Sequence, residues 1–75
     1  MPYLANIDLP TNLRRLLPSH AQDIYRAAFN SAWQEYEDPS RRHDHASQEE
    51  VSSRVAWAAV KLKYEKRDGE WMSIE

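Results

Sequence analysis

The chain of 75 residues has no cysteine and a single glycine. Without cysteine it forms no disulfide, and it has no Cys/His pattern typical of a structural zinc site. A domain of this size buries only about 60% of the surface that its unfolded chain exposes. Its stability must therefore come from packing, to which three Trp, four Tyr and one Phe bring large apolar areas.

Long apolar runs and an excess of either charge are also missing from the sequence. No segment approaches the roughly 20 apolar residues that a membrane helix needs, and residues 1–8 do not resemble a secretory signal. Ten basic and twelve acidic residues give a net charge of −2, which argues against a dedicated nucleic-acid binder. We therefore expect one soluble, cytoplasmic domain that covers residues 1–75 and does not insert into a membrane.

Helical periodicity predicts a compact, mainly α domain of about three helices. The first spans residues 9–16, where leucines recur at helical spacing behind Asp8 and a first-turn Pro10. Pro18 ends this helix, because a proline disfavours helical backbone at the residue before it.

The second predicted helix spans residues 19–37 and opens with the clearest helix-start signal in the chain. We expect Ser19 to cap the helix while the Gln22 side chain reaches back to the Ser19 backbone, as in a capping box. One face of this helix is apolar and rich in aromatics: Ala21, Tyr25, Ala28, Phe29, Ala32, Trp33 and Tyr36. We interpret this face as hydrophobic core rather than as a groove for a partner helix.

The third predicted helix spans residues 47–66 and begins with a second capping box, from Ser47 to Glu50. Two apolar stripes lie on nearly opposite sides of it: Val51, Val55, Ala58 and Leu62 form one, and Trp57, Val60 and Tyr64 form the other. A helix that is apolar on two sides is normally buried between two partners. The pattern predicts a central helix with the second helix on one side and the first helix and chain ends on the other.

The two ends of the chain favour a small sheet. Residues 70–74 alternate polar and apolar side chains after the turn signal Asp68-Gly69, and residues 2–5 have strand character. We expect these two segments to form a two-stranded antiparallel sheet. Such a sheet is marginal alone, so it should lie on the helices.

Except for Pro39 and Ala46, residues 38–46, between the second and third helices, are charged or polar, which predicts a surface loop. His43, Asp44 and His45, with Asp38 nearby, come nearest to a cation site. In an extended loop the two histidines point to opposite sides. A solvated loop is therefore the interpretation we adopt, and no metal site is predicted.

The carboxylate pairs do not form a catalytic arrangement. Glu35 and Glu37 diverge on a helix, and Glu49 and Glu50 suit the first turn of the third helix. The sequence has neither a nucleophile motif nor a phosphate-binding glycine loop. We therefore expect no enzyme activity and no cofactor.

Distinctive runs of residues occur from the start of the chain to about Trp71. They are Met1-Pro2-Tyr3, Asp8-Leu9-Pro10, Leu17-Pro18-Ser19-His20-Ala21-Gln22-Asp23-Ile24-Tyr25, Ala28-Phe29-Asn30-Ser31-Ala32-Trp33, and Val55-Ala56-Trp57-Ala58-Ala59-Val60-Lys61 with Tyr64. Together with the charged loop these runs resemble the ChaB family of small bacterial proteins. The chain departs from the family pattern at His43 and His45 and in a less basic tail.

The resemblance implies a compact, mainly helical fold with three principal helices and a small sheet. It also implies a soluble cytoplasmic regulator of a membrane calcium/sodium–proton antiporter of the ChaA type, and it supplies no catalytic residues. Because the charged segment displays both signs of charge, we predict that it docks the partner. The predicted docking residues are Arg41, Arg42, Asp44, Glu49 and Glu50. Cation sensing by the 38–45 loop and a small nucleic-acid-associated module are the alternative functions.

Overall fold

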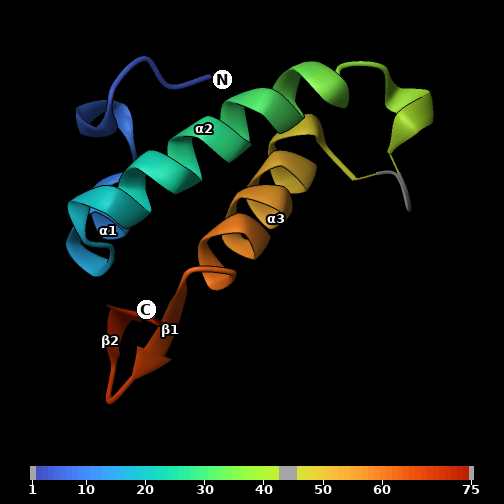
Figure 1. The fold of residues 1–75 in the computed structure, drawn as a ribbon. Helices are drawn as coiled ribbons and strands as arrows, with labels where there is room; N and C mark the ends of the chain where they lie inside the picture. Colours follow the sequence, from blue (N-terminus) through green and yellow to red (C-terminus); the bar gives the residue numbers. More distant parts are fainter. Residues whose placement is uncertain (1, 43–45, 75) are drawn as a thin grey trace.

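The computed structural model describes residues 2–42 and 46–74. Its elements in chain order are η1 (Asn6–Asp8), α1 (Thr11–Leu16), α2 (Ser19–Glu35), η2 (Pro39–Arg41), α3 (Gln48–Lys61), β1 (Tyr64–Arg67) and β2 (Glu70–Ser73) (Figure 1). Within these residues the predicted mainly α fold is confirmed, with three α-helices and one two-stranded antiparallel sheet.

The core lies where α2 packs along α3, with η1 and α1 folded against α2 (Figure 1). The aromatic face of α2 fills it, since Tyr25 and Phe29 are only 3% and 1% exposed. Their rings lie 6.0 Å apart between centroids. The other buried members of this core are Leu9, Leu13, Leu17, Ala21, Ala56, Val60 and Tyr64. The predicted core role of the second helix's apolar face is confirmed.

The start of α2 differs from the predicted capping box. Pro18 rather than Ser19 is the N-cap, and its carbonyl accepts the Gln22 backbone N–H at 2.9 Å. A proline has no N–H, so a Gln side chain cannot close a capping box on it. The Gln22 amide instead donates to the carbonyls of Leu17 at 2.8 Å and Arg14 at 3.3 Å. The predicted role of Ser19 is therefore wrong, and Gln22 ties the end of α1 to α2.

The first helix is shorter than predicted, because the chain forms η1 before it. The Asp8 carboxylate accepts the Ala5 N–H at 3.1 Å and so belongs to η1 rather than to α1. Pro10 is the N-cap of α1, and its carbonyl accepts the Leu13 and Arg14 backbone N–H groups. The backbone is extended at Leu17, where the following proline was predicted to end the helix.

The Ser47 half of the capping box predicted at the start of α3 is confirmed, since the Ser47 hydroxyl oxygen accepts the Glu50 backbone N–H at 3.0 Å. The Glu50 carboxylate accepts a hydrogen bond from Arg54 at 2.6 Å. The burial of α3 is one-sided. Ser52, Ala56 and Val60 are fully buried, whereas Ala58 is exposed and Leu62 is 80% exposed. The predicted burial between two partners is wrong, because the short α1 and the sheet flank the second side of α3 without covering it.

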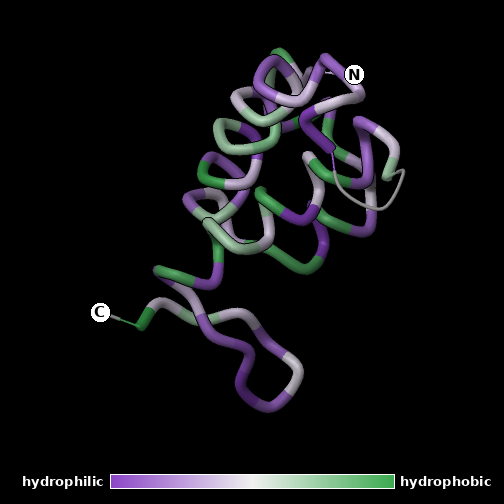
Figure 2. The backbone as a smooth tube through the Cα atoms, turned by 90° about the vertical axis from the view of Figure 1, so that its right-hand side faces the viewer, coloured by the Kyte–Doolittle hydropathy of each residue, from purple (hydrophilic) through white to green (hydrophobic). Residues whose placement is uncertain are grey.

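The sheet forms between neighbouring segments rather than between the chain ends. β2 pairs with β1, with Tyr64 opposite Ser73 and Lys66 opposite Trp71. Asp68 and Gly69 both adopt positive φ, at 49° and 82°, which suits a two-residue hairpin turn. Because this turn closes a very short loop, the hairpin forms at a lower entropic cost than pairing with residues 2–5. It projects from the end of the helical part (Figure 2), and the third helix accordingly stops at Lys61 instead of residue 66.

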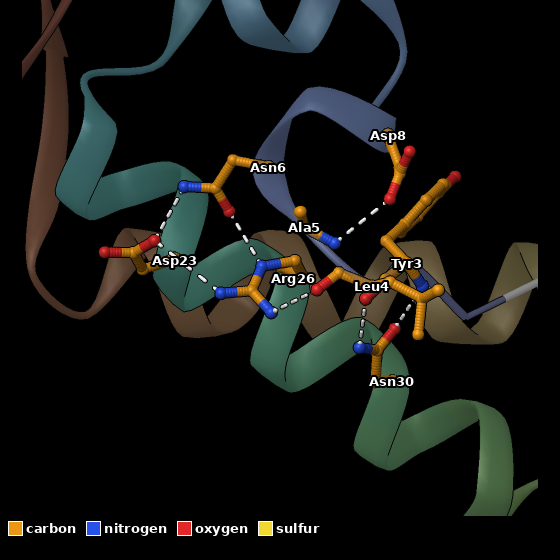
Figure 3. A network of polar contacts seen from close by, with 8 residues as sticks. All are labelled: Tyr3, Leu4, Ala5, Asn6, Asp8, Asp23, Arg26 and Asn30. Carbon is orange, nitrogen blue, oxygen red and sulfur yellow. Dashed lines mark hydrogen bonds and ion pairs between the residues drawn. The ribbon is translucent and has the colours of Figure 1, made fainter.

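The N-terminal segment is held by side chains of α2 instead of by a strand (Figure 3). The Asn30 side chain accepts the Tyr3 N–H and donates to the Tyr3 carbonyl, both at 2.8 Å. Arg26 donates to the Asn6 side-chain oxygen at 2.8 Å, and the Asn6 amide donates to Asp23 at 2.6 Å. These bonds satisfy the backbone groups of Tyr3 that a neighbouring strand would otherwise pair.

Candidate functional site

A groove of about 600 Å³ lies on α3, between the end of α1 and the hairpin. Its lining combines apolar and cationic side chains: Leu16, Ser53, Arg54, Trp57, Ala58, Lys61, Lys66 and Trp71. No carboxylate belongs to that lining in the part of the chain that the structure describes. We call this surface the basic groove.

The helical repeat of α3 supplies one wall of the basic groove. Trp57 and Lys61 are one turn apart, and Ala58 lies beside them on the same side of the helix. This side is turned away from the buried row formed by Ala56 and Val60. The groove therefore occupies the side of α3 that the sequence predicts to be covered.

Two tryptophans form the apolar end of the basic groove. The rings of Trp57 and Trp71 lie 5.4 Å apart between centroids, with their planes at 33°. Trp57 also sets its edge against the buried Tyr25 ring, at 5.4 Å and 77°. The strand register places Lys66 opposite Trp71, on the hairpin face that also carries the buried Tyr64. The core thus orients the aromatic pair, and the register positions one of the cations.

Positive charge in the basic groove comes mainly from two lysines. Arg54 donates to the Glu50 carboxylate at 2.6 Å in an exposed pair. In residues 2–42 and 46–74, no carboxylate forms an ion pair with Lys61 or Lys66. Two cations next to exposed apolar surface give this site an electrostatic preference for an anionic partner.

The two arginines of the predicted docking segment have different environments. Arg42 is half-buried, and its guanidinium donates to the carbonyls of Tyr36 at 2.9 Å, Glu37 at 3.0 Å and Ala46 at 3.4 Å. Arg41 is exposed and donates only weakly, at 3.4 Å, to the Glu35 carbonyl. Arg42 therefore holds the loop to the end of α2, whereas Arg41 leaves most of its guanidinium accessible.

The acidic residues of the docking segment are divided between η2 and α3. Glu49 and Glu50 are exposed in the first turn of α3, while Asp44 lies outside the described residues. Asp38 caps η2 by accepting the Ser40 backbone N–H at 2.9 Å. Hydrogen bonds from the Ser40 backbone and side chain, together with nearby arginine charge, lower the pKa of Asp38. The docking role of this segment stays a prediction.

The alternative cation site was predicted from four residues, of which the structure describes only Asp38. His43, Asp44 and His45 lie outside the described residues, and Asp38 is committed to η2. Among the residues that are described, no group of three or more His, Cys, Asp or Glu side chains is arranged to hold a metal ion.

The basic groove was not predicted from the sequence, although the sequence contains one signal for it. Trp57 and Ala58 belong to the two apolar stripes of the third helix, which were both predicted to be buried. Lys66 and Trp71 come together only through the hairpin register.

Among the helices of residues 2–42 and 46–74, none has the length and apolar character that a membrane span requires.

Comparison with known proteins identifies relatives over nearly the whole chain. The model of the ChaB family matches residues 9–73. A protein of Escherichia coli (strain K12), named "Putative cation transport regulator ChaB", is 57% identical over 68 residues, which cover 91% of this chain and 90% of the relative. A protein of Shigella flexneri with the same name matches equally well.

A solved structure has the same fold. It is described as the "NMR solution structure of the putative cation transport regulator ChaB". Its TM-score with the present structure is 0.81 at 52% sequence identity, over 99% of this chain and 100% of the other.

Proposed function

The chain belongs to the ChaB family, and from this premise we propose that it regulates a membrane calcium/sodium–proton antiporter of the ChaA type by binding to it. The observation that carries the proposal is the match, over 91% of the chain, to relatives named for the regulation of cation transport. The regulator acts from the cytoplasm as a soluble, non-enzymatic protein-binding module.

The charged segment between α2 and α3 is one part of the proposed binding surface. Arg41, Glu49 and Glu50 are exposed there and carry charges of both signs. Such a surface steers a complementary partner and sets its orientation. Arg42 contributes by holding the segment in place through its three carbonyl bonds.

Capture from bacterial membranes tests this proposal. The immobilised protein is incubated with detergent-solubilised membranes, and the antiporter is quantified in the eluate by mass spectrometry. We expect the wild type to capture the antiporter and Arg41→Glu to capture several-fold less. Arg67→Glu, which reverses an exposed arginine on β1 outside the lining of the basic groove, serves as the matched control and should behave like the wild type.

Failure of the wild type to capture the antiporter would contradict the proposed function. Equal capture by the wild type and Arg41→Glu would remove the charged segment from the binding surface and leave the regulatory role in place.

A further inference from the structure

We propose that the basic groove binds an acidic peptide segment of the protein partner, with carboxylates at both ends of the site and an apolar side chain between them. This inference rests on the proposed function in that the partner is a protein. It assigns the contact to a surface separate from the charged loop. Three observations carry it: the exposed apolar lining, two lysines that form no ion pair with a carboxylate among the described residues, and the spacing of Arg54 and Lys61 along α3.

The apolar lining gives a partner side chain a place to bury. Leu16 is 45% exposed and Ala58 is exposed, and both lie beside the Trp57–Trp71 pair. Trp57 is held by the core through Tyr25, so its position is set before a partner binds. A groove of about 600 Å³ lies within the roughly 300–1,000 Å³ range of sites that take up small groups.

The cationic side chains of the basic groove favour an acidic occupant. Lys61 and Lys66 have no carboxylate partner among the described residues. Arg54 already pairs with Glu50, but both side chains are more than half exposed. An exposed pair of this kind contributes little to stability, so a carboxylate of the partner can replace Glu50 at small cost.

The spacing of the cations favours a chain segment over a single small anion. Arg54 and Lys61 are seven residues apart on α3, which corresponds to about 10 Å along the helix axis. A helical partner spans this distance between residues seven apart, and an extended partner spans it between residues about three apart. The occupant is therefore expected to carry carboxylates at one of these two spacings.

A nucleic acid and a second copy of the chain fit the basic groove less well. The net charge of −2 repels a polyanion, and the Trp57 ring already packs against Trp71 and Tyr25, which leaves less of it open to stack on a base. The chain does carry an exposed apolar segment of its own at Leu4 and Ile7. Arg26, however, lies beside this segment and donates to the Leu4 carbonyl. The segment therefore carries a positive charge, which fits poorly in a groove that favours an acidic occupant.

Site-specific photocrosslinking in living cells identifies the occupant. Leu62→p-benzoylphenylalanine places the crosslinker at the exposed rim, one turn beyond Ala58. Ala27→p-benzoylphenylalanine, at an exposed position of α2, is the control. Crosslinked peptides are sequenced by mass spectrometry. We expect the Leu62 variant alone to yield an acidic segment with an apolar residue between its carboxylates.

Two pairs of variants test the groove itself. Ala58→Gln fills it with a neutral side chain and should lower the crosslink yield several-fold, whereas Ala27→Gln, the same change at an exposed site on α2, should not. Lys61→Glu should lower the yield several-fold because it reverses a charge of the site, and Lys61→Arg should retain it. All three positions are exposed, so the four variants should preserve the core; circular dichroism checks this.

The outcomes separate this inference from the proposed function. A crosslink to an acidic segment of a protein other than an antiporter would support the proposed role of the groove. It would contradict the proposal that the partner is an antiporter. If the wild type and Ala58→Gln capture the antiporter equally well, the groove is not the binding site. The proposed regulatory function is then unaffected. A crosslink to nucleic acid, to a basic segment or to a second copy of the chain, or no crosslink at all, overturns the inference.

Discussion

The neighbouring arginines of the charged segment should differ sharply in their effect on stability. We expect Arg42→Ala to lower the free energy of unfolding by about 2 kcal/mol and Arg41→Ala to lower it by less than about 0.5 kcal/mol. The reason is that Arg42 binds three backbone carbonyls that close the loop between α2 and α3, while Arg41 makes one long contact.

The magnitude follows from the geometry of the Arg42 contacts. Two of its bonds are short, at 2.9 Å and 3.0 Å, and the third is 3.4 Å long. A hydrogen bond that involves a charged group contributes about 1.5–3 kcal/mol when buried. Arg42 is only half-buried, so water replaces part of the lost bonding and the sum falls to about 2 kcal/mol. For a domain of this size, that corresponds to a decrease of about 8–16 °C in Tm.

Urea unfolding, followed by tryptophan fluorescence and far-UV circular dichroism, measures both variants. The slope of the free energy against urea should stay constant, which shows that the extent of unfolding is unchanged. Arg42→Lys is the control, because a single ammonium cannot reach all three carbonyls and should recover only part of the loss. Equal stability of Arg41→Ala and Arg42→Ala would refute the structural role of Arg42.

Three further changes probe other parts of the fold. Gly69→Ala should cost about 1 kcal/mol in a thermal melt because φ is 82°, although the new methyl group would meet no atom within 4 Å; a neutral result would contradict the turn geometry. Asn30→Ala removes two bonds to the Tyr3 backbone, so it should lower stability by about 1–2 kcal/mol and speed hydrogen exchange at the Tyr3 amide; unchanged exchange would argue against the tether. The pKa of Asp38 is lowered by its bonds to Ser40, so the ionised carboxylate stabilises the fold above the usual pKa of about 3.9, and this contribution disappears as pH falls through the lower folded-state pKa. Asp38→Asn should lose that part of the pH dependence, and acid unfolding curves identical to those of the wild type would contradict it.

Local signals in the sequence predict the helices well because each depends on neighbouring residues. The row from Ala21 to Ala32 recurs at helical spacing and is buried as expected, and the Ser47 cap depends only on the three residues that follow it. Pro18 separates α1 from α2 because its ring fixes φ and leaves it without a backbone N–H. In these places the local preference and the tertiary fold agree.

The errors arise where two segments compete for the same partner. The Gln22 side chain has two possible partners: the backbone at the start of its own helix and the open carbonyls at the end of α1. It binds the carbonyls. The strand at 70–73 has two candidate partners, and the Asp68-Gly69 turn selects the nearer one. The first competition depends on the distance between elements in the folded chain, whereas the second is decided by a local turn signal that favours the hairpin.

The same limitation explains why the basic groove is not evident in the sequence. The apolar stripe that contains Ala58 has the composition of a buried face. Its exposure follows from the small size of the elements around it, since α1 has only six residues and the strands have four each. Lys66 and Trp71 then join the site through strand register alone.

We propose that this protein binds a cation/proton antiporter directly and changes its activity. The most direct test is cation-driven proton exchange in proteoliposomes that contain only the purified antiporter, measured as the protein is added. The wild type and Ala27→Gln should change the exchange rate in a saturable way, while Ala58→Gln should have several-fold less effect. An exchange rate that stays constant at every concentration of the wild-type protein would contradict the account.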